Sequence, residues 1–421
     1  MAQDRVTELR ISGLRVIRQL TLPLNGLTVL IGDNGTGKSS ILEALEILRL
    51  AAKPVNHVTD VIMKGHGGFG ALLRRSAKEL SLGVSVEGAG PRVDYDFTLA
   101  NVGNTPTVLT ESVNAHYPGS KDRLLVLDRA GSRVIVSATS DRNPNTHTPQ
   151  KLGSAEQPAI VDQALALPFL DGRVHPSARR LVEALGHIEN HVPFEARPLW
   201  QAKELGLTQG PRWPSPLEAA DRLARFGVNL PNAFQELRNR GDRAWGRVLE
   251  RARLGLGADL RSFSLSPSGR GSIELEVLFG SWPDKPLPAE MLSEGQIAYL
   301  SMVALCELHS NRSLLAFDEP EVHLHPALLA RAVWMLEEAA ESAPVIVATH
   351  SDRLLDALED PAASVVLCEL DGERALRTSR PDRARLGEWL RDYRGLGALR
   401  AEGYEAQVFA EEGAPSGGTA Q

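Results

Sequence analysis

Apolar residues along this chain change their spacing several times, and each spacing predicts a different kind of element. The short apolar run at 27–31 has the length and composition of a buried strand. A glycine-rich turn follows it, and over 39–50 apolar residues recur every three or four positions, as on one face of a helix. This order of strand, glycine turn and helix is the context in which a loop can bind phosphate.

Strict alternation replaces this pattern further along the chain. Apolar and polar residues alternate over 80–86 and again over 93–99, on either side of a Gly/Pro turn. A period of two predicts antiparallel strands with one wet face. The polar stretch 138–157 is expected to form a loop.

From about residue 161 to 260 the pattern predicts helices that Pro and Gly interrupt. Ser215 is expected to cap one of them, because Pro216 suits a first turn and Glu218 completes a capping box. No heptad pattern persists, so long coiled-coil arms are not expected. A hairpin is expected at 264–279.

Helices and strands alternate again from residue 291 onward, with buried parallel strands expected at 314–317 and 345–348. The sequence therefore predicts an α/β fold whose two parts are separated by inserted segments. The expected units are an N-terminal part of the core at 1–75, an antiparallel β subdomain at 76–140, a mostly helical insertion ending in a β-hairpin at 141–285, a C-terminal part of the core at 286–410 and a flexible tail at 411–421.

Composition and charge narrow the class of protein. The chain carries 46 basic and 53 acidic residues, and its net charge of -7 does not indicate a globally basic nucleic-acid-binding protein. The first residues are charged and lack the apolar segment of a signal peptide, and no apolar run is long enough to cross a membrane. We therefore expect a cytoplasmic protein without a membrane partner, in which Cys306 and Cys368 are buried and inert.

The glycine turn at 32–39 matches the phosphate-loop pattern GxxxxGK[ST], the Walker A motif. Its glycines let backbone N–H groups converge on an anion, and the following helix adds the positive end of its dipole. Lys38 is expected to contact the β- and γ-phosphates of ATP, and Ser39 is expected to ligate Mg²⁺. The expected nucleotide-binding residues here are Gly32, Asp33, Asn34, Gly35, Thr36, Gly37, Lys38, Ser39 and Ser40.

Two carboxylates follow the strand predicted at 314–317, which is a Walker B pattern. Asp318 is expected to hold Mg²⁺, because this cation prefers oxygen ligands. Glu319 is then placed to polarise the attacking water and is the expected catalytic base.

The pentapeptide Leu292-Ser293-Glu294-Gly295-Gln296 precedes another predicted helix. Gln296 stands three residues after Ser293, in capping-box position, and an exposed helix N-terminus attracts anions. The pentapeptide resembles the signature LSGGQ of ABC ATPases, with Glu294 in place of the third-position glycine. The resemblance implies that Ser293, Gly295 and Gln296 bind nucleotide.

His350 lies just after the strand predicted at 345–348. It resembles the switch histidine of ABC ATPases, which contacts the γ-phosphate, and is expected to be catalytic. With four motifs in this order, the chain resembles a P-loop NTPase of the ABC type. In that family the signature binds the ATP of another subunit, so the resemblance implies a head-to-tail homodimer in the ATP-bound state.

The run at 318–326, DEPEVHLHP, is similar to that of AAA-family ATPases grouped with RecF-like, SMC-like and OLD-like (overcoming-lysogenization-defect) proteins. Its histidines, His323 and His325, are expected to form hydrogen bonds at the dimer interface, and a metal site is the alternative.

OLD nucleases continue after the switch histidine with a Toprim nuclease domain. Here Glu369, Asp371 and Glu373 suggest a metal site, but a hairpin with an Asp-Gly turn explains them better. We therefore expect no nuclease on this chain. A glutamine of the Q-loop type cannot be located from the sequence.

Arginines gather within the insertion. Arg243, Arg247 and Arg251 are spaced four residues apart, on one face of a predicted helix. Such a face could follow a phosphate backbone or bind an acidic partner. The alternative is a solvated face that acids on another element balance.

The sequence thus predicts an ATPase, converting ATP to ADP and phosphate, in which ATP binding closes a dimer and hydrolysis reopens it. The family resemblance connects this cycle to DNA or to an effector protein such as a nuclease, in DNA repair or antiviral defence. Two alternatives stand beside it: an ATP-dependent DNA clamp without a protein effector, and the energising subunit of a membrane transporter.

Overall fold

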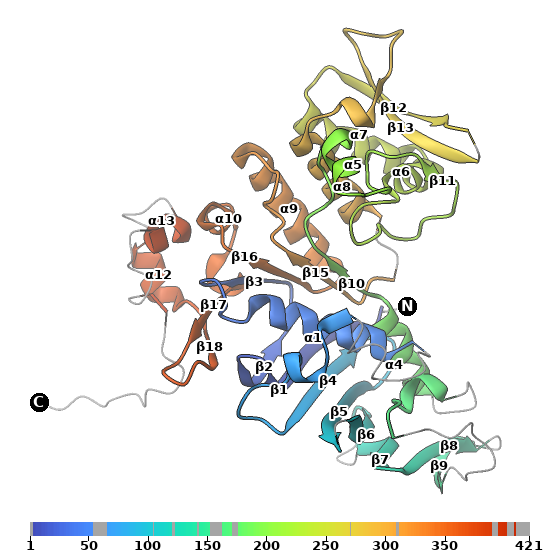
Figure 1. Cartoon of the computed structure of the whole chain (residues 1–421), viewed down its shortest axis with the longest axis vertical. Coiled ribbons are helices and arrows are strands. Elements are labelled where there is room, and N and C mark those ends of the chain that lie inside the picture. Colours follow the sequence, from blue (N-terminus) through green and yellow to red (C-terminus); the bar gives the residue numbers. More distant parts are fainter. Residues whose placement is uncertain are drawn as a thin grey trace, which may run out of the picture.

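The computed structural model of this chain contains three parts: an antiparallel sheet, a central and mostly parallel sheet, and a helical lobe with a small third sheet (Figure 1). The structure describes residues 3–53, 65–103, 105–119, 123–140, 143–151, 162–170, 176–269, 271–308, 311–389, 395–401 and 408–409.

The central sheet has six strands in the order β10-β15-β16-β3-β17-β18. All are parallel to their neighbours except β18, which is antiparallel to β17. Every residue of β3 and of β16 is buried, as expected for the continuous apolar runs of a parallel sheet covered on both faces. The strands are β3 (Leu27–Ile31), β10 (Ile188–His191), β15 (Leu314–Asp318), β16 (Val345–Thr349), β17 (Val365–Leu370) and β18 (Leu376–Ser379).

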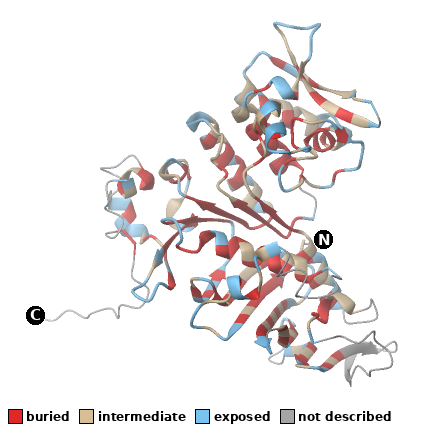
Figure 2. Ribbon diagram, in the orientation of Figure 1, coloured by how far each residue is buried: buried red, intermediate tan, exposed pale blue. Residues whose placement is uncertain are grey.

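Alternate residues of the central strands face two different cores. Leu30 packs in the core that contains the apolar face of α1 (Lys38–Ala51) and the antiparallel sheet. Val29 packs in the other core, with α8 (Glu294–Glu307) and α9 (Pro326–Ser342). The central sheet therefore lies between α1 and α9, and its buried strands form the middle of the molecule (Figure 2).

The antiparallel sheet has eight strands in the order β2-β1-β4-β5-β6-β7-β8-β9. Because β1 pairs with both β2 and β4, the N-terminal hairpin and the alternating stretch after residue 78 form one sheet. Its strands are β1 (Arg5–Leu14), β2 (Ile17–Pro23), β4 (Glu79–Glu87), β5 (Arg92–Val102), β6 (Thr105–His116), β7 (Arg123–Ala130), β8 (Arg133–Ser140) and β9 (Asn143–Lys151).

The prediction of a loop at 138–157 was wrong for residues 143–151, which form a strand. β9 pairs with β8 as the last strand of the antiparallel sheet. An edge strand is held by backbone hydrogen bonds and needs no continuous apolar face, so a polar sequence concealed it. Residues 152–157 lie outside the described part of the chain.

The helical lobe consists of α5 (Leu199–Glu204), α6 (Leu230–Asn239), α7 (Asp242–Leu256), α8 and a small sheet. In that sheet β12 (Leu260–Pro267) and β13 (Ser272–Phe279) form the predicted hairpin, and β11 (Ser215–Pro216) and β14 (Leu287–Pro288) both pair with β13. The remaining helices are α3 (Phe69–Leu72), α4 (Pro176–Gly186), α10 (Asp352–Asp356), α11 (Pro361–Ser364), α12 (Arg383–Trp389) and α13 (Leu396–Ala401), with 3-10 turns at Leu167–Phe169 and Ala289–Met291.

Ser215 does not begin a helix, so that prediction was wrong. Instead Ser215 pairs with Ile273 of β13, and its hydroxyl donates a hydrogen bond to the Val228 carbonyl at 2.8 Å. Contacts with distant segments of the chain thus outweigh the local capping pattern.

The arginines of α7 do not form one free face. Arg251 is buried, with its guanidinium 2.9 Å from Glu307 on α8 and 2.6 Å from Glu338 on α9. Arg247 lies 3.4 Å from the same Glu307, while Arg243 is exposed. Acidic residues on neighbouring helices therefore balance the charge of this face. A balanced face was the alternative to a phosphate-binding surface. Replacing all three arginines with Glu would therefore break helix packing as well as change surface charge.

Candidate functional site

The phosphate loop joins β3 to α1 at the carboxyl end of the central sheet. Gly35 and Gly37 have φ values of 81° and 107°, in the left-handed region that glycine tolerates best. The Lys38 ammonium folds back over the loop and donates to the carbonyls of Gly32 at 2.7 Å and Asp33 at 3.0 Å. Burial lowers the pKa of Lys38. The loop therefore surrounds a partly desolvated cation, which an anion would stabilise.

Two oxygen groups meet beside this lysine. The Ser39 hydroxyl at the start of α1 donates to Asp318 Oδ2, at the end of β15, at 3.2 Å. Burial raises the pKa of Asp318, and the hydrogen bond from Ser39 opposes that rise. Hydroxyl and carboxylate oxygens are ligands that Mg²⁺ prefers, so this pair fits the ion.

Glu319 and His350 complete the cluster from β15 and β16. His350 Nε2 lies 3.2 Å from Glu319 Oε1, and His350 Nδ1 lies 3.4 Å from the Lys38 ammonium. Glu319 has a φ of 49°, and its N–H donates to the Ala348 carbonyl at 2.8 Å. A non-glycine residue held in the left-handed region is uncommon and clusters at functional sites. The backbone therefore directs this carboxylate toward His350.

Glu321 is a site residue that the sequence did not single out. Its Oε1 accepts hydrogen bonds from the Thr349 hydroxyl and, at 3.3 Å, from the His350 N–H. Its Oε2 is buried and has no hydrogen-bond partner among the residues that the structure describes. Burial raises the pKa of Glu321, and the Thr349 hydrogen bond opposes the rise. Glu321 thus fixes the backbone that carries His350, and the only signal for it was its place in the 318–326 run.

Replacing Glu321 with Ala should lower the rate of ATP hydrolysis about ten-fold, because the loss of a charge-assisted hydrogen bond costs ~1.5 kcal/mol. Glu321→Gln should keep most of the rate, since its amide oxygen can still accept from Thr349 and His350. Steady-state phosphate release, with ATP affinity measured in parallel, distinguishes the two. An equal loss in both variants would contradict a positioning role.

The signature segment caps α8 as the sequence predicts. Ser293 Oγ accepts from the Gln296 N–H at 3.2 Å, and Gln296 Oε1 accepts from the Ser293 N–H at 2.9 Å. Glu294, which stands where the ABC signature has glycine, lies 2.9 Å from His323 Nδ1. A Cβ on Gly295 would lie 3.0 Å from the His323 carbonyl oxygen. The signature therefore touches the loop that follows Asp318.

Both histidines of that loop have partners within the chain. His323 pairs with Glu294, and His325 Nδ1 accepts from the Ala327 N–H at 3.3 Å, capping α9. Over the described residues, no group of three or more His, Cys, Asp or Glu side chains could hold a metal ion.

The structure thus brings one set of predicted residues together and leaves another apart. Residues 32–40, Asp318, Glu319 and His350 lie at one edge of the central sheet. In the part of the chain that the structure describes, residues 293–296 form no hydrogen bond or ion pair with the phosphate loop at 32–40.

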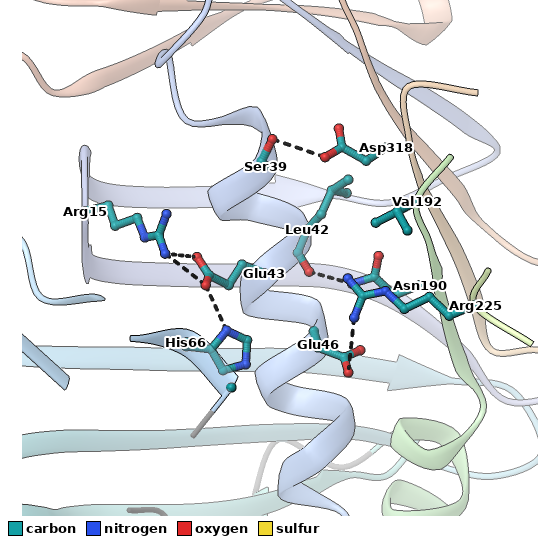
Figure 3. Close-up of a pocket in the computed structure, with 11 residues that line it drawn as sticks. Arg15, Ser39, Leu42, Glu43, Glu46, His66, Asn190, Val192, Arg225 and Asp318 are labelled. Atoms are coloured by element: carbon teal, nitrogen blue, oxygen red, sulfur yellow. Dashed lines mark hydrogen bonds and ion pairs between the residues drawn. The ribbon is translucent and has the colours of Figure 1, made fainter. Parts of the chain in front are cut away.

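A cavity of ≈ 290 Å³ lies beside Ser39 and Asp318, between α1 and the end of β10 (Figure 3). Asn190 of β10 donates to the Leu42 carbonyl at 2.9 Å and so ties this strand to α1. Val192, just beyond β10, also lines this cavity, and no glutamine is among its lining residues in the described part of the chain.

Comparisons with known proteins match both parts of the site. The family described as "AAA ATPase domain" matches residues 5–68, which include the phosphate loop. The family described as "AAA domain, putative AbiEii toxin, Type IV TA system" matches residues 228–356, which include the signature, both carboxylates and His350. Protein ea59 of Escherichia phage lambda is 32% identical over 120 residues, which is 28% of this chain and 21% of that protein. The match thus spans about a fifth of the phage protein's length.

Among solved structures, an SMC head domain from Pyrococcus furiosus, with an extended coiled coil and bound to the C-terminal domain of ScpA, has a TM-score of 0.51. It is 12% identical and the match covers 92% of this chain and 99% of that one. The SMC head domain from Thermotoga maritima has a TM-score of 0.43 at 11% identity, covering 90% of this chain and 99% of that one. The likeness to the P. furiosus structure confirms the predicted P-loop fold of the ABC type. Two segments of the chain thus match models of AAA ATPase families, and the chain is folded like an SMC head.

Proposed function

We propose that the chain binds ATP in its phosphate loop and hydrolyses it to ADP and phosphate. One observation carries this proposal: at one edge of the central sheet, His350 lies 3.4 Å from the Lys38 ammonium and 3.2 Å from the Glu319 carboxylate. Lys38 binds the β- and γ-phosphates, Glu319 accepts a proton from the attacking water, and His350 donates a hydrogen bond to the γ-phosphate. Mg²⁺, held by Ser39 and Asp318, would neutralise phosphate charge.

We further propose that Ser293, Gly295 and Gln296 bind the ATP of a second copy of this chain. Two features support it: Ser293 is exposed at the N-terminus of a 14-residue helix, and it caps that helix without bonding its own phosphate loop. A helix N-terminus favours an anion. Two copies related by a two-fold axis would each place their signature beside the phosphate loop of the other copy, which closes the assembly as a dimer.

Replacing Ser293 with Arg should prevent ATP-driven dimerisation while leaving ATP binding by the monomer intact. The large side chain would occupy the place where the partner's γ-phosphate docks. Sedimentation with ATP and Mg²⁺, in a Glu319→Gln background that slows hydrolysis, measures the dimer. Ser281→Arg adds the same charge to another exposed serine of the helical lobe and serves as control. Persistent ATP-driven dimers of the Ser293 variant would refute the head-to-tail arrangement.

The output of this cycle is proposed to act on DNA or on an effector protein such as a nuclease. One comparison supports a role in defence: a matching family is described as a putative AbiEii toxin of a Type IV TA system. The P. furiosus SMC head was solved bound to the C-terminal domain of ScpA. A role in DNA repair rests on family resemblance alone.

Two alternatives predict different partners. A DNA clamp without an effector would bind DNA in an ATP- and salt-dependent manner, and would recover no protein partner. A transporter subunit would co-purify with a membrane protein. No helix in the described part of the chain is both long enough and apolar enough to cross a membrane.

A further inference from the structure

The C-terminal helix α13 packs tightly against α10, the helix that follows His350. A Cβ on Gly397 would lie 1.8 Å from the Asp352 carbonyl oxygen, and one on Gly395 would lie 2.3 Å from Asp356 Oδ1. The N–H groups of Gly397 and Ala398 donate to that same Asp356 oxygen at 2.7 and 3.2 Å. Only residues without side chains at 395 and 397 allow this approach, so the position of α13 is closely fixed.

Arg400 of α13 lies beside the phosphate loop, because α13 packs against α10. One terminal nitrogen of the Arg400 guanidinium, Nη1, donates to Asp352 Oδ1 at 2.7 Å. The other terminal nitrogen, Nη2, lies 3.6 Å from Asp33 Oδ1. The Arg400 side chain is 14% exposed, whereas that of Asp33 is 93% exposed. Arg400 therefore joins the second residue of the phosphate loop to the segment two residues beyond His350.

The two ion pairs of Arg400 differ in strength. The pair with Asp352 is short and partly buried, so it orients the guanidinium. The pair with Asp33 is longer and its carboxylate is in water, where such a pair contributes little. Lys38 contacts the same loop residue, because its ammonium donates to the Asp33 carbonyl at 3.0 Å. Two cations thus lie close to Asp33, one at its carbonyl and one at its carboxylate, an arrangement that a multiply charged anion would stabilise better than one carboxylate.

We propose that Arg400 is a phosphate ligand supplied by the C-terminal part of the same chain, and that its guanidinium exchanges Asp33 for the terminal phosphate of bound ATP. This inference rests on the proposed binding of ATP in the loop. Asp352 keeps the guanidinium oriented during the exchange. Because Asp352 follows His350 closely, ATP then draws the phosphate loop, the histidine segment and α13 together. ADP lacks the terminal phosphate and leaves Arg400 on Asp33.

The test compares binding of ADP with that of a non-hydrolysable ATP analogue by calorimetry. Arg400→Ala should weaken binding of the analogue about ten-fold, as expected for one charge-assisted hydrogen bond, and leave ADP affinity nearly unchanged. Gly397→Ala, which forces α13 away from α10 without altering Arg400, should cause the same selective loss. Arg383→Ala removes an exposed pair with Asp360 elsewhere in the C-terminal segment and is the matched control.

Each outcome separates the two proposals. Equal weakening of the analogue and of ADP in Arg400→Ala would assign the arginine a structural role and overturn the inference, as would no weakening at all. Wild-type protein that binds neither nucleotide would overturn the proposed function, and the inference with it. Thermal unfolding of each variant shows whether a loss of binding follows from a loss of fold.

Discussion

Replacement of Lys38 with Ala is expected to abolish ATP binding, with an affinity at least roughly 100-fold weaker, or ~2.7 kcal/mol. Lys38 is the cation that the phosphate loop encloses, and its ammonium donates to the loop carbonyls of Gly32 at 2.7 Å and Asp33 at 3.0 Å. Without it those carbonyls would face the phosphates with no intervening positive charge. Calorimetry with ATP and Mg²⁺ measures the loss.

Lys53→Ala is the matched control for Lys38→Ala, because Lys53 is exposed just beyond the end of α1. This control should bind ATP as the wild type does. A folded Lys38→Ala protein with unchanged ATP affinity would show that the glycine turn is not a nucleotide site.

Replacement of Glu319 with Gln is expected to preserve ATP binding and slow hydrolysis by roughly 100-fold or more, the usual contribution of a general base. The amide keeps the shape of the side chain beside His350 but cannot accept a proton from water. ATP should then hold the protein as a closed dimer. Phosphate release gives the rate, and sedimentation gives the oligomeric state.

Glu369→Gln, at an exposed position on β17, controls for the loss of one carboxylate. Hydrolysis at the wild-type rate in Glu319→Gln would show that the base is another group. The trapped protein is also the best reagent for recovering DNA or an effector, since it should remain in the state that either partner recognises.

The central strands could be predicted because their sequences are apolar without interruption. The runs at 27–31, 314–317 and 345–348 correspond to β3, β15 and β16, and the periodic stretch at 39–50 corresponds to α1. Burial on both faces leaves an unmistakable composition in each strand.

β10 could not be predicted because it is short and polar. Its buried residues include Glu189, which lies 2.8 Å from Arg312. Burial alone would raise the pKa of Glu189, but the charge of Arg312 brings that pKa down to about 2. A polar strand of this kind becomes stable only when a distant partner is present, and no local pattern signals that partner.

The same limit applies to the candidate site. Lys38, Asp318 and His350 belong to motifs that can be recognised one at a time. Glu321 and Arg400 matter only through contacts, with the Thr349–His350 segment and with Asp33. These contacts join residues far apart in the chain, so no spacing in the sequence could predict them.

The strand order of the central sheet also determines when the domain can fold. β3 has β16 and β17 as its neighbours, so residues 27–31 pair only with segments more than 300 positions later. A growing chain must therefore be synthesised beyond residue 345 before the strand that precedes its phosphate loop gains a first neighbour, and beyond residue 365 before it gains a second. Contacts so distant in sequence slow folding and leave an apolar strand without a partner meanwhile. The strands of the antiparallel sheet all precede residue 152, so this sheet can form first. The central sheet can form only later, when β16 and β17 have been synthesised.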